Sequence, residues 1–403
     1  MGIRRCAVVW IEPREDATFR LEDLLAGGTG IVSRLEWRAH APHLTGPLTI
    51  DSRQVALLGE LSPMDWLDRP ELEATHGHEA VAGLLETGLL VARDDQSAHA
   101  RADAEYRGAG WHAAAALAHQ GSRWQGVDAS ADGSEALLRR GPAPAHFRPG
   151  SAAGATVALP QVAPSTFDAL LDARTTCRNY DPAAWVPLAM FSQLMARVFG
   201  ARGVLEQSPD CAVVKRTSPS GGALHPTECW LIVQRVEGIQ PGLYRYRMDG
   251  HGLDPVEPKI WPPAPHDVAS KPRDDAAPRP WDATALRTFA RIAVAGQTWF
   301  EDAPVLCVLA VRFERNFWKY RNHAKAYRVA VLDVGHLSQT LQLCATEAGL
   351  APFVTAAINE ADIESAFGLT SYLESPLAVC GFGPRATTLT TTEFNPNGGI
   401  ASR

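Results

Sequence analysis

Three short segments, in a fixed order in the second half of the chain, constrain the fold and function more than any other feature. Each combines hydroxyls, glycines or charged groups in a spacing that a plain surface loop does not need. They are Arg174-Thr-Thr-Cys-Arg178-Asn-Tyr180, Ser218-Pro-Ser-Gly-Gly-Ala-Leu-His-Pro-Thr-Glu228 and Tyr327-Arg-Val-Ala-Val-Leu-Asp-Val-Gly-His336-Leu-Ser-Gln339.

The first segment places two guanidiniums and two hydroxyls between Arg174 and Arg178. Guanidinium forks and hydroxyls suit a buried phosphate or polyol. The second segment is a turn of small residues, which lets the backbone approach a flat ligand closely. The third opens a long helix with polar residues on an otherwise apolar surface. Alone, the first segment would also fit a surface loop with two solvated arginines, but the order of all three favours a ligand site.

Composition limits the classes of partner and compartment. The 403 residues carry a net charge of −7, with 46% hydrophobic and 21% charged residues. Two domains are expected at this length, and the negative charge argues against nucleic acid or an anionic membrane as the main partner.

The apolar stretch Cys6 to Trp10 is too short for a signal sequence and predicts a first strand. No apolar run approaches a membrane span, and seven cysteines without a Cys-x-x-Cys pair predict a reduced, cytoplasmic protein.

Residues 1–126 are expected to form one domain. Strands at 8–11 and 48–50, helices at 55–67 and 80–85, and a strand at 89–93 give the order of a winged helix. Between Glu60 and Glu86 there are seven acidic residues and one arginine, which disfavours DNA binding. Residues 127–162 are predicted to be a linker and 163–403 a second domain, with a proline-rich insertion at 255–280 that is either a lid or disordered.

Together the three segments resemble the nitroreductase-like flavoproteins, and more narrowly the SagB-type dehydrogenases that oxidise azolines in ribosomally made peptides. The resemblance covers about residues 163–390. It implies an α+β fold in which a mixed sheet flanked by helices binds FMN at a homodimer interface. It also implies that an N-terminal winged-helix-like domain precedes this fold in the chain. In peptide-modifying enzymes such a module often holds a leader peptide by β-augmentation; a purely structural role is the alternative.

The resemblance assigns cofactor-binding residues by position. It implies that the FMN phosphate and ribityl chain are held by Arg174, Thr175, Thr176 and Arg178. It implies that the flavin is lined by Pro219, Ser220 and Gly221. The loop that stacks on the flavin ring matches Val354, Thr355, Ala356 and Ala357, where nitroreductases often have an acidic residue and glycine. Arg385 is a candidate second phosphate ligand. Asp333 replaces the usual glutamate and is one methylene shorter, which leaves its contact open.

The pair Lys319-Tyr320 follows an apolar strand that begins near Pro304 and ends at Phe313. SagB-type azoline oxidases place a Lys-Tyr pair here and use it as acid and base, so the resemblance implies that role for Lys319 and Tyr320. Azoline oxidation removes a proton from carbon while a hydride leaves to the flavin, and a desolvated lysine beside an aromatic hydroxyl can act as the base. Without the resemblance, a solvated lysine at a strand end is the simpler interpretation.

The implied function is that of a cytoplasmic FMN-dependent dehydrogenase that converts azolines to azoles. Its partners would be a modified precursor peptide and a cyclodehydratase or other maturation enzyme. A wide apolar face on the helix 326–349 predicts a homodimer; it consists of Val329, Leu332, Leu337, Leu341, Cys344 and Ala348. Two alternatives stay open: a reductase of dehydroamino acids or another NAD(P)H-dependent nitroreductase-like enzyme, and a catalytically lapsed scaffold in a peptide synthetase complex. No metal site is predicted.

Overall fold

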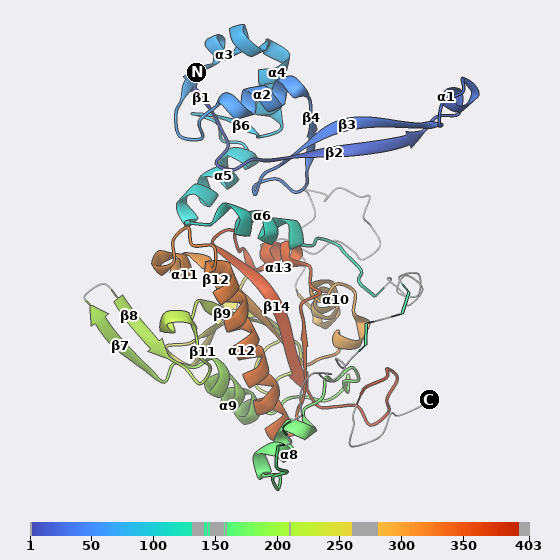
Figure 1. Cartoon of the computed structure of the whole chain (residues 1–403). Coiled ribbons are helices and arrows are strands. Elements are labelled where there is room, and N and C mark those ends of the chain that lie inside the picture. The colour runs from blue at the N-terminus through green and yellow to red at the C-terminus, as the bar shows by residue number, and fades with distance from the viewer. Residues whose placement is uncertain are drawn as a thin grey trace. The chain divides into compact units, whose positions relative to one another are not determined.

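The computed structural model of the chain describes residues 2–130, 141–142, 144–145, 157, 159–208, 211–259 and 281–394. The chain divides into two compact units (Figure 1). The first comprises Met1–Arg123 and Phe313–Arg328, and the second Trp124–Arg312 and Val329–Arg403. Most of the predicted linker and of the proline-rich insertion lies outside the described residues. Within the described part of the chain, no helix is both long and apolar enough to cross a bilayer.

The first unit is built on a small antiparallel sheet of order β5-β1-β6. Its strands are β1 (Gly2–Arg5), β5 (Leu67–Asp68) and β6 (Leu90–Ala92). Its helices up to residue 123 are α1 (Leu21–Leu25), α2 (Ser52–Glu60), α3 (Arg69–His76), α4 (His78–Glu86), α5 (Ala98–Ala109) and α6 (Ala113–Ser122). The core of this unit joins the sheet to α2 and α4, because Ile3, Leu58, Leu84 and Leu90 are fully buried in one cluster.

Local signals explain where α2 begins and ends. Asp51 and Gln54 form a capping box, in which each side chain accepts a hydrogen bond from the other residue's backbone N–H. The predicted helix to residue 67 is too long, since the chain becomes extended at Leu61, two residues before Pro63. Proline disfavours helical conformation in the residue before it and cannot donate a helical hydrogen bond. The second predicted helix is confirmed as α4.

A long hairpin, β2 (Trp10–Phe19) with β3 (Ile31–His40), was not predicted (Figure 1). β4 (Leu48–Ile50) adds to β3, so β2 lies at the edge of this sheet. The predicted strand from Cys6 to Trp10 is wrong, because the strands run from Gly2 to Arg5 and from Trp10 onward. Pro13 does not end β2, since proline is tolerated in an edge strand that has no partner for the missing N–H.

An aromatic cluster explains why residues 313–328 belong to the first unit rather than to the predicted domain 163–403. The ring centroid of Trp111 lies 5.1 Å from that of His119, 4.5 Å from Phe313 and 4.7 Å from Phe317. Phe313 and Phe317 come from α11 (Phe313–Lys319). Aromatic rings that bury this much surface dominate local packing energy, and they attach α11 to α5 and α6.

The second unit contains a six-stranded sheet of order β11-β10-β9-β12-β14-β13. Its strands are β9 (Thr227–Val233), β10 (Gly242–Arg247), β11 (Gly252–Val256), β12 (Val305–Arg312), β13 (Ala351–Thr355) and β14 (Glu374–Gly383). All five pairings are antiparallel, so the predicted mixed sheet is corrected to an antiparallel one. One isolated parallel bridge joins Val186 to Val236 outside the strands. The predicted α+β class is confirmed. A separate hairpin consists of β7 (Gly203–Ser208) and β8 (Cys211–Lys215).

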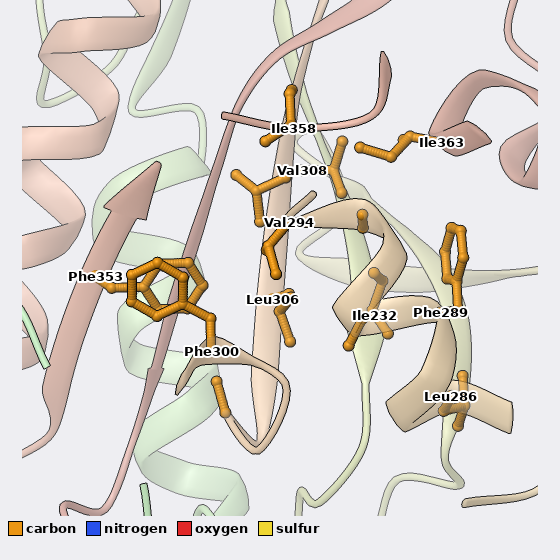
Figure 2. Packing of buried hydrophobic residues seen from close by; sticks show 14 of the residues in the cluster. Ile232, Leu286, Phe289, Val294, Phe300, Leu306, Val308, Phe353, Ile358 and Ile363 are labelled. Carbon is orange, nitrogen blue, oxygen red and sulfur yellow. The ribbon is translucent and has the colours of Figure 1, made fainter. Parts of the chain in front are cut away.

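Helices cover both faces of this sheet. α10 (Ala283–Ala293) and α13 (Glu360–Phe367) pack on one face with Leu306 and Val308. In the same core the rings of Phe300 and Phe353 stack with centroids 3.9 Å apart (Figure 2). α9 (Leu188–Phe199) packs on the other face, where Phe191 approaches Phe382 of β14 at 6.4 Å.

The long helix α12 (Ala326–Glu347) does not expose the apolar face that the sequence predicts. Leu337 and Leu341 are buried within their own chain. Only Leu332 of the predicted face is exposed, and the neighbouring Val331 is exposed with it. The exposed apolar surface of α12 is therefore a short patch at Val331 and Leu332, whereas Val329, Cys344 and Ala348 are half-buried.

Candidate functional site

The arginine-rich segment begins where α8 (Thr166–Ala173) ends. Ser165 and Asp168 form the capping box that starts α8, and the chain is extended again at Arg174. Nη1 of Arg174 donates a hydrogen bond of 3.1 Å to Oε1 of Gln342 on α12. This contact fixes the half-buried Arg174 side chain along the helix.

The structure brings two predicted phosphate ligands together, although 210 positions separate them in the chain. Nη2 of Arg385 donates to Oγ1 of the buried Thr175 over 3.0 Å. Thr176 and Arg178 are half-buried, and their side chains make no hydrogen bond or ion pair with the described residues. Within the described part of the chain, the segment that carries the Thr175–Arg385 contact thus has one hydroxyl and one guanidinium without a partner.

The small-residue turn is bonded to α12 through its polar groups. Ser220 Oγ donates to Oδ2 of Asp333 at 2.5 Å, and the backbone N–H of Gly221 donates to Oδ1 at 3.1 Å. The hydroxyls of Ser218 and Thr340 lie 2.7 Å apart. These contacts hold the turn against one side of α12 in a defined conformation.

Asp333 reaches the turn despite being one methylene shorter than glutamate. Burial raises the pKa of Asp333, and the hydrogen bonds from Ser220 and Gly221 oppose that rise. A carboxylate that accepts two such bonds is held in place and holds the turn in return. The contact that the sequence left open is thus made, and it positions the turn.

The turn also has a strained backbone. The φ angles of Gly222, Ala223 and His225 are 65°, 55° and 46°. For residues other than glycine this region is sparsely populated and costs on the order of 1–3 kcal/mol each. At Gly221 a Cβ atom would lie 2.2 Å from Cγ1 of Val329, so a larger residue would push the turn away from α12. Backbone strain of this kind concentrates at ligand-binding turns.

Both segments are held by side chains of α12. Asp333 holds the turn, and Gln342 holds Arg174. Residues 333 and 342 are nine positions apart, which is about 2.5 helical turns and about 13.5 Å along the axis. The turn and Arg174 therefore contact opposite sides of α12, and the helix fixes the position of each segment separately.

The predicted ring-stacking residues lie at the end of a strand that is hydrogen-bonded to the arginine-rich segment. Cys177 N–H donates to Pro352 O at 2.8 Å, and Tyr180 Oη donates to Ala351 O at 3.1 Å. The prediction of a loop is corrected in part, because Val354 and Thr355 end β13 and only Ala356 and Ala357 follow it.

Gln297, which the sequence reasoning missed, organises the end of β13. Its Nε2 donates to Thr355 Oγ1 at 3.1 Å and to Ala357 O at 2.9 Å. The Thr355 hydroxyl also accepts the N–H of Ala357. The hydrogen bonds of the Thr355 side chain therefore stabilise the conformation of the loop that follows β13.

Cys177 packs in the core as a small apolar side chain. Its thiol is fully buried and donates to Asn179 O at 3.4 Å. Burial raises its pKa, which keeps it a thiol rather than the reactive thiolate.

The candidate acid/base pair lies in the first compact unit, at the end of α11. Nζ of Lys319 lies 5.7 Å from the centroid of the Tyr320 ring. The Lys319 side chain is exposed and Tyr320 is half-buried. The described residues of the chain thus do not provide the desolvation expected for Lys319, and the predicted strand end is a short helix.

Comparison with known proteins identifies the family. The family model described as "Nitroreductase family" matches residues 171–384, more than half of the chain. The chain belongs to the nitroreductase family. The resemblance seen in the sequence is thereby confirmed, and membership indicates an oxidoreductase of a family whose members generally bind flavin.

Among the curated relatives of this nitroreductase-family chain are two peptide-processing proteins. The trifolitoxin-processing protein TfxB of Rhizobium leguminosarum bv. trifolii is 28% identical over 167 residues, which are 41% of this chain and 38% of TfxB. The microcin B17-processing protein McbC of Escherichia coli is 30% identical over 180 residues, 44% of this chain and 57% of McbC. A nitroreductase-like protein of Methanocaldococcus jannaschii is 23% identical, over 54% of this chain and 91% of its own length. The chain thus matches about half the length of the two peptide-processing relatives.

Proposed function

We propose that the chain is an FMN-dependent dehydrogenase that oxidises azoline rings to azoles in a ribosomally made precursor peptide. Family membership supports flavin chemistry, and the names of TfxB and McbC support a peptide substrate. The observation that carries the cofactor assignment is the hydrogen bond from Arg385 to Thr175, which brings together two predicted phosphate ligands that are 210 positions apart in the chain. A maturation enzyme that forms the azoline is the proposed partner.

The residues present fit FMN. The available guanidinium of Arg178 and hydroxyl of Thr176 would bind the phosphate and ribityl chain, together with Arg174, Thr175 and Arg385. Guanidiniums bind phosphate oxygens through charge-assisted hydrogen bonds. The backbone of Pro219, Ser220 and Gly221 would line the ring, because the glycine turn admits close approach. Val354 to Ala357 would contribute mainly backbone to the ring contact.

The proposed reaction removes two hydrogens from the azoline. FMN, when bound, would accept the hydride, and an external acceptor such as dioxygen would reoxidise it. Lys319 would take the proton from the ring carbon, and the Tyr320 hydroxyl would orient or assist Lys319. The bound peptide would then supply the desolvation of Lys319 that the described residues do not provide.

A thiazoline-containing peptide tests this function directly. The flavin-loaded protein in air should convert it to a product lighter by two hydrogens, with the absorbance of an aromatic thiazole, measured by mass spectrometry and spectrophotometry. A peptide carrying dehydroalanine, with NAD(P)H, is the comparison. Gain of two hydrogens by that peptide, with the thiazoline untouched, would replace oxidation by the reductase alternative.

A homodimer through α12 belongs to the same proposal. The exposed patch of Val331 and Leu332 is where a second copy would bury apolar surface. Leu332→Asp should place a charge in that interface and give a monomer mass by light scattering, whereas Leu332→Met should leave a dimer. A wild-type protein that is monomeric with its flavin bound would contradict the dimer.

A further inference from the structure

The residues after β14 fold back over the arginine-rich segment. We call residues 384–394 the C-terminal strap. Asn179 anchors it, because its Oδ1 accepts the N–H groups of Thr390 and Thr391 at 2.8 Å each. Its backbone carbonyl accepts the N–H of Ala386 at 2.8 Å, and its Nδ2 donates to Thr391 O. One buried asparagine within the cofactor motif thus carries most of the polar contacts of the strap.

The strap inserts a carboxylate beside the proposed phosphate ligands. Glu393 is only 5% exposed. Its Oε1 accepts the backbone N–H of Arg178 at 2.5 Å and Nδ2 of Asn179 at 2.8 Å, and its Oε2 forms an ion pair with Arg385. These three donors, from Arg178, Asn179 and Arg385, form an anion cradle in which the Glu393 carboxylate is bound.

The cradle and the proposed phosphate site share Arg385. This guanidinium donates to Thr175 on one side and pairs with Glu393 on the other. A phosphate beside Arg385 would stand close to a buried carboxylate of the same sign, and like charges in a partly desolvated site repel strongly. Arg385 therefore cannot form an equally strong ion pair with both the phosphate and the Glu393 carboxylate.

We propose that Glu393 is an internal anion that competes with the cofactor phosphate for Arg385, so that phosphate binding releases the C-terminal strap. The inference rests on the proposed function in one respect, that the ligand is FMN. Glu393 then sets the affinity for the phosphate group specifically. A flavin without phosphate does not contend with Glu393 and leaves the strap in place.

Binding of FMN and riboflavin to matched variants tests the competition. Glu393→Gln keeps the size and the hydrogen-bonding oxygen but removes the charge. It should tighten FMN binding by about tenfold or more, the scale of one charge-assisted bond, and leave riboflavin binding unchanged. Glu237→Gln removes an equal charge at an exposed position and should change neither affinity. A Glu393→Gln variant that binds FMN more weakly, or shifts both flavins equally, would show that Glu393 only positions Arg385.

Hydrogen exchange on the wild-type protein tests strap release without any substitution. FMN and inorganic phosphate should speed exchange of the Thr390 and Thr391 amides, and riboflavin should not. Slower or unchanged exchange with both phosphate ligands would overturn the proposal. A protein that binds no FMN, yet releases the strap in phosphate, would instead contradict the proposed function and leave the competition standing.

Discussion

Replacing both Arg174 and Arg178 with alanine should give a folded protein that does not retain FMN, whereas the wild type should purify yellow with one FMN per subunit. Each guanidinium–phosphate contact contributes on the order of 1.5–3 kcal/mol, so losing two weakens binding by about 10²–10⁴-fold. Folding should survive, because the only side-chain hydrogen bond these residues make to the described structure is that of Arg174 to Gln342. Flavin absorbance and far-UV circular dichroism measure the two outcomes.

The matched control replaces both arginines with lysine. Lysine keeps the charge but lacks the two-pronged geometry of guanidinium, so this variant should bind FMN with intermediate affinity. A wild-type protein without a flavin spectrum, even after reconstitution with FMN, would contradict the cofactor assignment itself. A double alanine variant that keeps its colour would move the phosphate to other residues.

Local structure was predictable where the signal lies within one turn of helix or one strand. Ser165 and Asp168 mark the start of α8, and the apolar run to Val233 marks β9. The predictions fail where the position of a segment in the folded protein determines its structure. Pro13 reads as a strand terminator, yet the edge position of β2 tolerates it. Two pairings of the large sheet, β9 with β12 and β12 with β14, join segments far apart in sequence, which no local pattern encodes.

The candidate site shows the same division. The residue types of the 174–178 segment and the 218–221 turn indicate a ligand, and family resemblance names it. The side chains that hold those segments in place are identified fully only from their contacts in the structure. Asp333 and Gln342 gave a partial signal, as polar residues on a mostly apolar helix. Glu393 gave none, because its partner Asn179 lies 214 positions away.

Replacing Lys319 with alanine should leave FMN bound and slow azoline oxidation by about 10²–10⁴-fold, the usual contribution of a positioned general base. The flavin takes the hydride but not the proton, so the reaction needs a base at the ring carbon. Lys319 is exposed in its own unit, so its loss should cost little stability. The rate of azole formation at saturating peptide, with flavin content measured on the same sample, gives the result.

Two companion variants separate the roles within the pair. Tyr320→Phe should cost less than Lys319→Ala if the hydroxyl only orients the lysine, and as much if the phenol is itself the base. Lys325→Ala removes an exposed lysine from the same segment and should leave the rate unchanged. In the reductive direction the same residues would donate the proton, so these variants test the acid/base assignment and not the direction of electron flow. Because a simple nitroreductase does not need this pair, full activity of Lys319→Ala with FMN retained would remove both residues from the mechanism.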